Sequence, residues 1–202
     1  MKTAQVQQKP SGTGRAWTIA LVIFLGAVLV IAAILALGGG TSFTLKSGST
    51  LPSFSATDLD GTAIDNSFFA SHRVTMVNVW GTFCGPCIEE MPDLAQLPAV
   101  FAPADFALVG IVADTSYQNT SANAETTATA RQLIASAKAT YRNIIPDRVL
   151  VEKVLPGVSV VPTTFFVDSS GKLIGDPIEG SGTKDQWVKL IQSVLDSLPA
   201  TP

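Results

Sequence analysis

The chain has 202 residues, of which 13 are basic and 16 acidic, for a formal charge of −3, and 47% are hydrophobic. This length suits one domain of ordinary size together with an additional hydrophobic segment. The weakly acidic balance argues against nucleic acid as a partner, because binding to nucleic acid depends on concentrated basic charge.

Residues 17–37 form a long uncharged run near the start of the chain. As a helix this run would span ~32 Å, against ~30 Å for the hydrocarbon core of a bilayer, and it has no polar face, which excludes a buried core helix. Lys2, Lys9 and Arg15 precede the run and no acidic residue does. The positive-inside rule therefore predicts a cytoplasmic tail over residues 1–16, a transmembrane anchor, and an extracytoplasmic remainder.

A cleaved secretory signal peptide is the alternative interpretation, because residues 36–38 resemble a small-residue cleavage site. The apolar region of a signal peptide is normally about 7–15 residues long, so the longer run at 17–37 favours an uncleaved anchor. Residues 38–50 are rich in Gly, Ser and Thr and are expected to form a flexible linker. The remaining domain is expected over residues 51–198.

The predicted extracytoplasmic part is more acidic than the whole chain. Of the 13 basic residues, three precede the anchor, and the other 10 against 16 acidic residues give a formal charge of −6. Such a surface is not suited to anionic headgroups, so we expect the anchor alone to hold the chain at the membrane.

The domain alternates between strand-like and helix-like segments. Residues 54–64 predict a hairpin with an Asp60-Gly61 turn, and the continuous apolar runs 74–80 and 106–113 are typical of buried parallel strands. A helix is predicted after residue 87, and Pro92 and Pro98 are expected to kink or end it. A second helix is entered from 119–130 and runs to about residue 141, and a short helix covers 148–155. A hairpin of 163–167 with 172–178 and an amphipathic helix over 183–198 complete the predicted elements.

The two cysteines of the chain lie in the run Trp80-Gly-Thr-Phe-Cys84-Gly-Pro-Cys87, at the point where a predicted strand turns into a predicted helix. A single pair at this spacing is typical of a redox dithiol. Gly85 relieves the tight turn, and Pro86 is tolerated in a first helical turn. Cys84 is therefore expected at the helix N-terminus, where unpaired N–H groups and the helix dipole favour a thiolate.

These positions predict different roles for the two cysteines. A free cysteine titrates near ~8.5, whereas cysteines of such motifs at helix starts titrate at roughly 3.5–7.5. Cys84 is the candidate nucleophile, and the less exposed Cys87 is the candidate resolving cysteine. Attack by Cys84 on a substrate disulfide and resolution by Cys87 would leave a Cys84–Cys87 disulfide and a substrate dithiol.

Other uses of the cysteine pair are less consistent with the sequence. A structural disulfide would close too short a loop to add much stability. Zinc needs about four ligands, and the chain offers two cysteines and a single His72, so we expect neither a metal nor another cofactor. A peroxide-reducing cysteine usually follows a threonine three residues earlier, where this chain has Gly81.

Several motifs together resemble the thioredoxin superfamily: Trp80, the Cys84-Gly-Pro-Cys87 motif, Pro92, and Val161-Pro162-Thr163 ahead of an apolar run. Within it, Val77-Asn-Val-Trp80 followed by Cys84-Gly-Pro-Cys87-Ile-Glu-Glu90-Met-Pro92 is similar to the TlpA/ResA group of membrane-tethered disulfide reductases. The resemblance spans residues 51–198. It implies an α/β thioredoxin-like fold, a mixed sheet flanked by helices after one transmembrane helix.

The resemblance also implies a substrate-binding surface around a cis Val161–Pro162 bond that faces the dithiol. A proline donates no hydrogen bond, so backbone groups beside Pro162, above all those of Val161, stay free to pair with an extended substrate. Gly85 and Pro86 are expected in the same surface. Trp80 has two interpretations that remain open, core packing and the floor of the site.

Glu90 is the candidate proton acceptor for Cys87. Thioredoxin has a buried aspartate where this chain has Asn78, so that carboxylate is missing. Residues three apart share one face of a helix, which places Glu90 near Cys87. An ordinary solvated acid is the alternative interpretation.

Together these features predict a membrane-anchored, extracytoplasmic thiol–disulfide reductase of protein disulfides. The Gly-Pro pair between the cysteines resembles the reducing members of the superfamily; an oxidase or isomerase and a non-catalytic binding module are the alternatives. The resemblance implies a membrane thiol transporter of the CcdA/DsbD kind as electron donor. The sequence does not name the substrate: apocytochrome c, as in cytochrome c maturation, a methionine sulfoxide reductase and a general pool of misoxidised proteins all fit.

Overall fold

The computed structural model describes residues 43–116 and 122–199. Within these residues, seven strands form one mixed sheet in the order β2-β1-β5-β4-β3-β6-β7. Strand β3 pairs in parallel with β4, and β4 in parallel with β5, while the remaining neighbours are antiparallel. The strands are β1 (Ser55–Asp58), β2 (Ala63–Asp65), β3 (Val74–Trp80), β4 (Phe106–Val112), β5 (Arg142–Ile145), β6 (Thr163–Asp168) and β7 (Leu173–Glu179).

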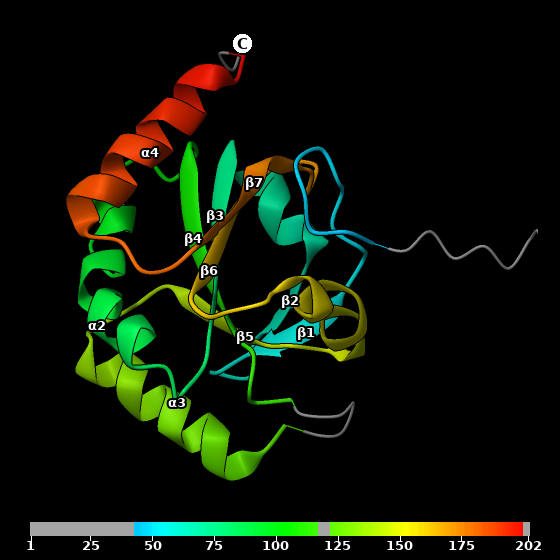
Figure 1. Cartoon of the computed structure of the whole chain (residues 1–202), viewed down its shortest axis with the longest axis vertical. Coiled ribbons are helices and arrows are strands. Elements are labelled where there is room, and N and C mark those ends of the chain that lie inside the picture. Colours follow the sequence, from blue (N-terminus) through cyan, green and yellow to red (C-terminus); the bar gives the residue numbers. More distant parts are fainter. Residues whose placement is uncertain (1–42, 117–121, 200–202) are drawn as a thin grey trace, which may run out of the picture. The chain divides into compact units, whose positions relative to one another are not determined.

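Helices cover both faces of the sheet. Among the described residues, α2 (Gly85–Leu94), α3 (Ala124–Ser136) and α4 (Lys184–Ser197) lie together on one side of the strands (Figure 1). The short helices η1 (Asn66–Ser71) and η4 (Leu150–Val154) pack against the other face. This architecture confirms the predicted thioredoxin-like α/β sheet flanked by helices.

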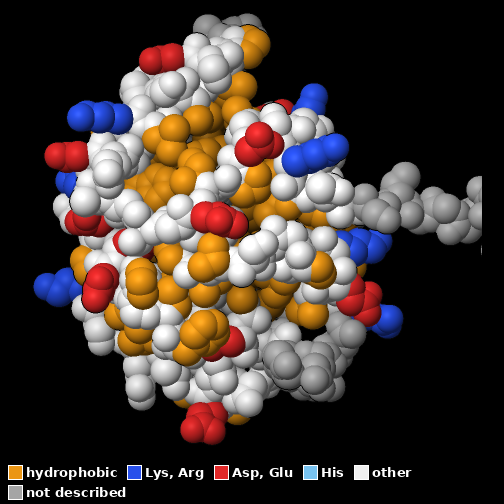
Figure 2. All heavy atoms as spheres, viewed as in Figure 1, with side chains coloured by type: hydrophobic (Ala, Val, Ile, Leu, Met, Phe, Trp, Pro, Cys, Tyr) orange, Lys and Arg blue, Asp and Glu red, His pale blue; other side chains and the backbone are white. Residues whose placement is uncertain are grey.

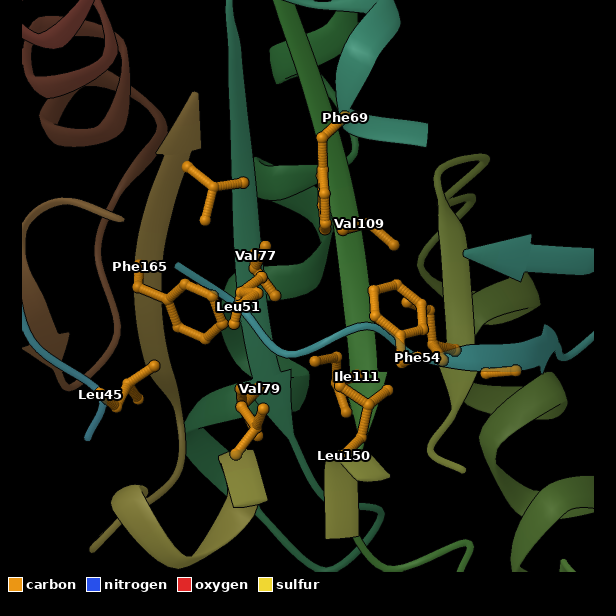
Figure 3. Packing of buried hydrophobic residues seen from close by; sticks show 14 of the residues in the cluster. Leu45, Leu51, Phe54, Phe69, Val77, Val79, Val109, Ile111, Leu150 and Phe165 are labelled. Carbon is orange, nitrogen blue, oxygen red and sulfur yellow. The ribbon is translucent and has the colours of Figure 1, made fainter. Parts of the chain in front are cut away.

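Each strand contributes side chains to both faces of the sheet, because successive side chains of a strand point in opposite directions. Val77 and Val79 of β3 pack on the η1 face, and Figure 3 shows them beside Phe165 of β6, under the segment that carries Leu51 and Phe54. The alternate residues of β3 face the α-helices instead, where they join the clusters that contain α2 and α4. Strand β3 is consequently buried along its whole length.

On the face of the sheet that α2, α3 and α4 cover, one row of residues across the strands includes three polar side chains. The register aligns Thr164 of β6 with Asn78 of β3, Asn78 with Gly110 of β4, and Gly110 with Asn143 of β5. Gly110 is required in this row, because a Cβ there would lie 2.0 Å from Oδ1 of Asn143. That oxygen accepts a hydrogen bond from Nε1 of Trp80 at 2.9 Å.

The predicted hairpins and the strands at 74–80 and 106–113 are confirmed within a residue or two. Strand β5 was not predicted, because its four residues begin with Arg142-Asn143 and lack a run of apolar side chains. The helix predicted to reach about residue 141 ends at Ser136. Lys138 adopts a positive φ of 54°, and the N–H of Ala139 donates to the carbonyl of Ile134, which closes the helix and turns the chain into β5.

The packed domain starts ahead of the predicted boundary at residue 51. Leu45 is buried, the N–H of Gly48 donates to the carbonyl of Leu173 at 3.0 Å, and Thr50 forms a bridge with Lys172. Residues 43–50 of the predicted linker therefore extend the edge of the sheet at β7. This contact arises from backbone hydrogen bonds, which the Gly- and Ser-rich composition of the segment does not reveal.

The predicted tail at 1–16, the anchor at 17–37 and residues 38–42 of the predicted linker lie outside the described residues. Within 43–116 and 122–199, none of the helices has both the length and the apolar character that crossing a membrane requires.

Candidate active site

The two cysteines lie at the end of β3 and the start of α2, as predicted. Cys84 is the N-cap of α2, with an extended backbone, and the helix begins at Gly85. The two sulfur atoms form a disulfide, with the Cα atoms 5.3 Å apart. Cys84 is 6% exposed and Cys87 1% exposed. A substrate therefore reaches the sulfur of Cys84 more readily than that of Cys87.

The start of α2 places hydrogen-bond donors and the positive end of the helix beside Sγ of Cys84. The backbone N–H of Cys87 donates to Sγ of Cys84 at 3.2 Å. Pro86 stands in the first turn, where its missing N–H removes no helical hydrogen bond. After reduction this N–H group and the positive end of the helix would both favour the thiolate form of Cys84.

An open groove of about 530 Å³ lies beside the disulfide. Phe83 and the motif residues from Cys84 to Pro86 line one side, and residues 158–161 line the other. None of the described residues that line it is charged, and Phe83 and Val160 are 76% and 47% exposed. The structure thus brings together three predicted substrate-binding residues, Gly85, Pro86 and Val161, with the apolar rim that Phe83 and Val160 add.

The Val161–Pro162 bond is cis, as the resemblance implies. The carbonyl oxygen of Val161 lies 3.4 Å from Sγ of Cys84. Pro162 is buried at the start of β6, and its carbonyl accepts a hydrogen bond from the N–H of Gly180 at 2.8 Å. Of these two residues, Val161 therefore presents its backbone to the groove.

Trp80 lies under the disulfide and not at the surface. Its side chain is fully buried in the cluster that contains Cys84 and Cys87, and its Nε1 donates to Asn143. Of the two interpretations that the sequence leaves open, the structure supports core packing beneath the site. Trp80 has no surface with which to touch a docked chain.

Glu90 is buried, which excludes the interpretation as a solvated acid. It is 4% exposed, and its two carboxylate oxygens accept separate hydrogen bonds, one from Nδ2 of Asn78 at 3.1 Å and one from the N–H of Gly182 at 3.0 Å. Nδ2 of Asn78 also donates to Oγ1 of Thr164 at 3.1 Å. Burial raises the pKa of Glu90 above its usual value, and the hydrogen bonds from Gly182 and Asn78 oppose that rise.

The sequence pointed to Asn78 only as the loss of a carboxylate. The structure shows that its amide holds the carboxylate of Glu90, which comes from α2 and not from the sheet. Gly182, just before α4, was not identified at all. Its only sequence signal is a glycine beside the helix-capping Thr183, and nothing in the pattern links that loop to Glu90.

His72 lies away from the dithiol. It follows η1 and precedes β3, so it stands at the opposite end of β3 from the cysteines, and its Nδ1 lies 2.6 Å from the carbonyl oxygen of Pro103. In the part of the chain that the structure describes, no three His, Cys, Asp or Glu side chains are grouped so as to hold a metal.

The chain matches the Redoxin family over residues 46–187. It belongs to this family. It is also similar to the thiol-disulfide oxidoreductase ResA of Bacillus cereus, with 27% identity over 172 residues that cover 80% of this chain and 92% of the relative. ResA of Geobacillus thermodenitrificans is 27% identical over 73% of this chain and 77% of its own length.

A solved structure supports the fold. A thiol:disulfide interchange protein DsbE from Chlorobium tepidum superposes with a TM-score of 0.59 at 22% identity, and the match covers 75% of this chain and 99% of that one. This Redoxin family member is therefore a ResA/TlpA-like protein of the thioredoxin superfamily. With a Cys84–Cys87 disulfide at the start of α2, it is a disulfide oxidoreductase.

The raised pKa of Glu90 predicts a pH dependence of stability. Between the usual value of 4.5 and the higher folded value, the folded chain keeps a proton that the unfolded chain has lost. Glu90 therefore favours folding at low pH, and this contribution disappears as the pH rises through that window. Glu90→Gln removes the titration, so wild type should lose stability relative to the variant over the window.

Urea denaturation at pH values on both sides of the window measures this difference. Glu89→Gln is the matched control, because Glu89 is the exposed neighbour on the same helix, and its curve should follow wild type. Parallel curves for wild type and Glu90→Gln would show that Glu90 titrates alike in the folded and unfolded chains.

Proposed function

We propose that this oxidoreductase is a membrane-anchored, extracytoplasmic reductase of protein disulfides. The observation that carries the proposal is the disulfide itself, whose more exposed sulfur caps α2 and faces an uncharged groove. Such a site suits thiol–disulfide exchange with a polypeptide, because sulfur and backbone groups are presented together.

The reaction begins with the reduced dithiol. The thiolate of Cys84 attacks one sulfur of the substrate disulfide, a mixed disulfide forms, and the other substrate sulfur leaves as a thiolate that takes up a proton. The N–H of Cys87 stabilises the attacking thiolate through the hydrogen bond to Sγ. The exposed rim and the carbonyl of Val161 flank the attacking atom.

Resolution requires Cys87 to lose its proton. Its thiolate then attacks Sγ of Cys84, the second substrate sulfur leaves and is protonated, and the chain carries the Cys84–Cys87 disulfide. Two electrons have passed to the substrate. Glu90 is the proposed acceptor, since it lies three residues further along α2 and is buried as Cys87 is. A pKa raised by burial makes its carboxylate a better acceptor than a solvated one.

An extended segment of the substrate docks across the groove. Backbone groups of Val161 pair with it, Gly85 and Pro86 allow its close approach, and cis-Pro162 shapes the backbone at this point. The uncharged lining of the groove suits an uncharged segment beside the substrate disulfide.

The Gly-Pro pair between the cysteines supports reduction over oxidation, by its resemblance to reducing members of the superfamily. A reductase outside the cytoplasm needs electrons, and a CcdA/DsbD-type membrane thiol transporter is the proposed donor. Apocytochrome c or a methionine sulfoxide reductase are the proposed substrates. On the face shown in Figure 2, acidic and basic side chains are interspersed, which supports a protein partner over nucleic acid there.

The proposed localisation rests on the sequence of residues 1–50. The uncharged run at 17–37 acts as a single-pass anchor, residues 1–16 stay in the cytoplasm, and residues 38–42 lead to the packed domain outside.

The reduction potential tests the direction of the reaction. For the full chain in mild detergent it should lie nearer the ~−270 mV of thioredoxin than the ~−120 mV of a strong oxidant, measured by alkylating thiols after equilibration with glutathione buffers. A value above about −180 mV would instead favour an oxidase or isomerase. As a control for the assigned roles, Cys87→Ser should accumulate mixed disulfides on Cys84, whereas Cys84→Ser should accumulate none.

Replacement of the proposed proton acceptor tests the resolution step. Glu90→Gln should slow release of a trapped substrate about tenfold, which corresponds to roughly 1.4 kcal/mol of transition-state stabilisation, and should leave the first attack nearly unchanged. Single-turnover kinetics from about pH 6 to about pH 9 measure both steps. Glu89→Gln should match wild type; equal rates for all three proteins would assign the proton to water.

The anchor predicts a protease pattern. In intact spheroplasts, added protease should digest the domain while a cytoplasmic marker protein survives, and a carbonate wash should leave the undigested chain in the membrane. A shortened form of the chain that is released into the soluble fraction would instead support a cleaved signal peptide.

A further inference from the structure

The loop before Cys84 lies against the loop that follows β4. Strands β3 and β4 are parallel neighbours that end in register, with Trp80 opposite Val112. The carboxyl ends of parallel neighbours meet at one edge of a sheet, so the next segments leave it side by side. The N–H of Ala113 donates to the carbonyl of Trp80 at 2.8 Å and prolongs the pairing by one residue.

Asp114 holds the loop before the motif. Its two carboxylate oxygens accept the backbone N–H of Thr82 at 3.2 and 3.1 Å, and Oδ2 also accepts the hydroxyl of Thr82 at 2.5 Å. The turn that carries Asp114 is itself fixed, because both the N–H and the hydroxyl of Thr115 donate to the carbonyl of Val112. A carboxylate is thus anchored to the residue two positions before Cys84.

The charge of Asp114 lies near the backbone of Cys84. Two residues of chain span at most ~7 Å, so the carboxylate that binds Thr82 lies within about 10 Å of that backbone. The turn between Gly81 and Cys84 is closed by a backbone hydrogen bond of 3.1 Å, which shortens this path. At such a separation a negative charge disfavours a thiolate and opposes the effect of the helix N-terminus.

Several elements pack around the disulfide, and some of them carry titratable groups besides Asp114. The groove residues 158–161 carry none. Within the described residues, Asp114 alone hydrogen-bonds to residues 81–83 through its side chain. The other groups are Glu89, Glu90 and Asp93 on α2, Glu125 and Arg131 on α3, and Asp58 and Asp60 on either side of Leu59.

We propose that Asp114 is a positioning residue that fixes the Thr82 loop and, through its charge, makes the dithiol a stronger reductant. The reason is that a more stable thiolate makes the reduced form more stable and the disulfide more oxidising. Asp114 has the opposite effect, because it destabilises the thiolate of the reduced form. This inference rests on the proposed role of Cys84 as the attacking cysteine.

Asp114→Asn tests the charge. In the reduced full chain in mild detergent, the variant should lower the pKa of Cys84, read from the pH dependence of its alkylation, by about half a unit to one unit. Its equilibrium with glutathione should shift about three- to tenfold toward the reduced form, a tenfold shift being ~30 mV. Because Cys84 is buried and Asp114 only partly exposed, about 1 M salt should reduce the pKa difference without abolishing it.

Matched variants separate charge from loop geometry. Thr82→Val removes the hydroxyl bond and keeps the carboxylate, and Asp114→Glu keeps the charge, so both should hold the pKa of Cys84 near the wild-type value. Asp196→Asn is the distant control. Its neighbour Leu195 accepts a hydrogen bond through its carbonyl from Arg73, which stands just before β3. Asp196 thus lies at the far end of β3, and the seven residues of this strand span about 20 Å.

The outcomes are distinct. An unchanged pKa of Cys84 in Asp114→Asn, or equal shifts in Asp114→Asn and Thr82→Val, overturns this inference and leaves the proposed function intact. Faster alkylation of Cys87 than of Cys84 in wild type overturns the proposed role of Cys84 itself. A shift of the same size in Asp114→Glu, which keeps the charge, assigns the effect to altered geometry and also rejects the inference.

Discussion

The burial of β3 along its whole length determines where the chemistry takes place. The strand is paired on both sides, with β4 in parallel and with β6 antiparallel, and both of its faces are covered. Its end at Trp80 is therefore a fixed point, from which three residues lead to the N-cap of α2. The first cysteine lies just beyond the carboxyl end of this central strand, and the second lies under the first turn of α2 and is less exposed.

A fully covered strand leaves no solvent to satisfy polar side chains, so each must find a partner in the protein. Asn78 and Asn143 meet this requirement in different ways. Asn78 donates to Glu90 and Thr164, whereas Asn143 accepts the indole N–H of Trp80. The two amides thus support two parts of the site, the buried carboxylate on α2 and the aromatic ring under the disulfide. Gly110 lies between them because its position has no room for a side chain.

Two carboxylates accompany the dithiol, and their surroundings differ. Glu90 is buried and held by Asn78 and Gly182, and its pKa is raised, which suits it to take up a proton. Asp114 is partly exposed, and Thr82 satisfies both of its oxygens. In the proposed mechanism the first acts on the resolving cysteine, and the second restrains the attacking cysteine. On these two proposals, the fold assigns proton transfer and redox poise to different carboxylates.

Local pattern determined the parts of this protein that depend on neighbours in sequence. The run 74–80 and the placement of Cys84 at a helix start follow from apolar continuity and helix capping. Gly85, which was expected at a tight turn, is instead the first residue of α2. Strand β5 escaped prediction, since Arg142 and Asn143 are explained only by partners elsewhere, Asp58 and Trp80. The burial of Glu90, the role of Asn78 and the contact of Asp114 with Thr82 were decided by tertiary structure alone. Each joins segments that the sheet brings together from distant parts of the chain, and periodicity carries no information about such pairs.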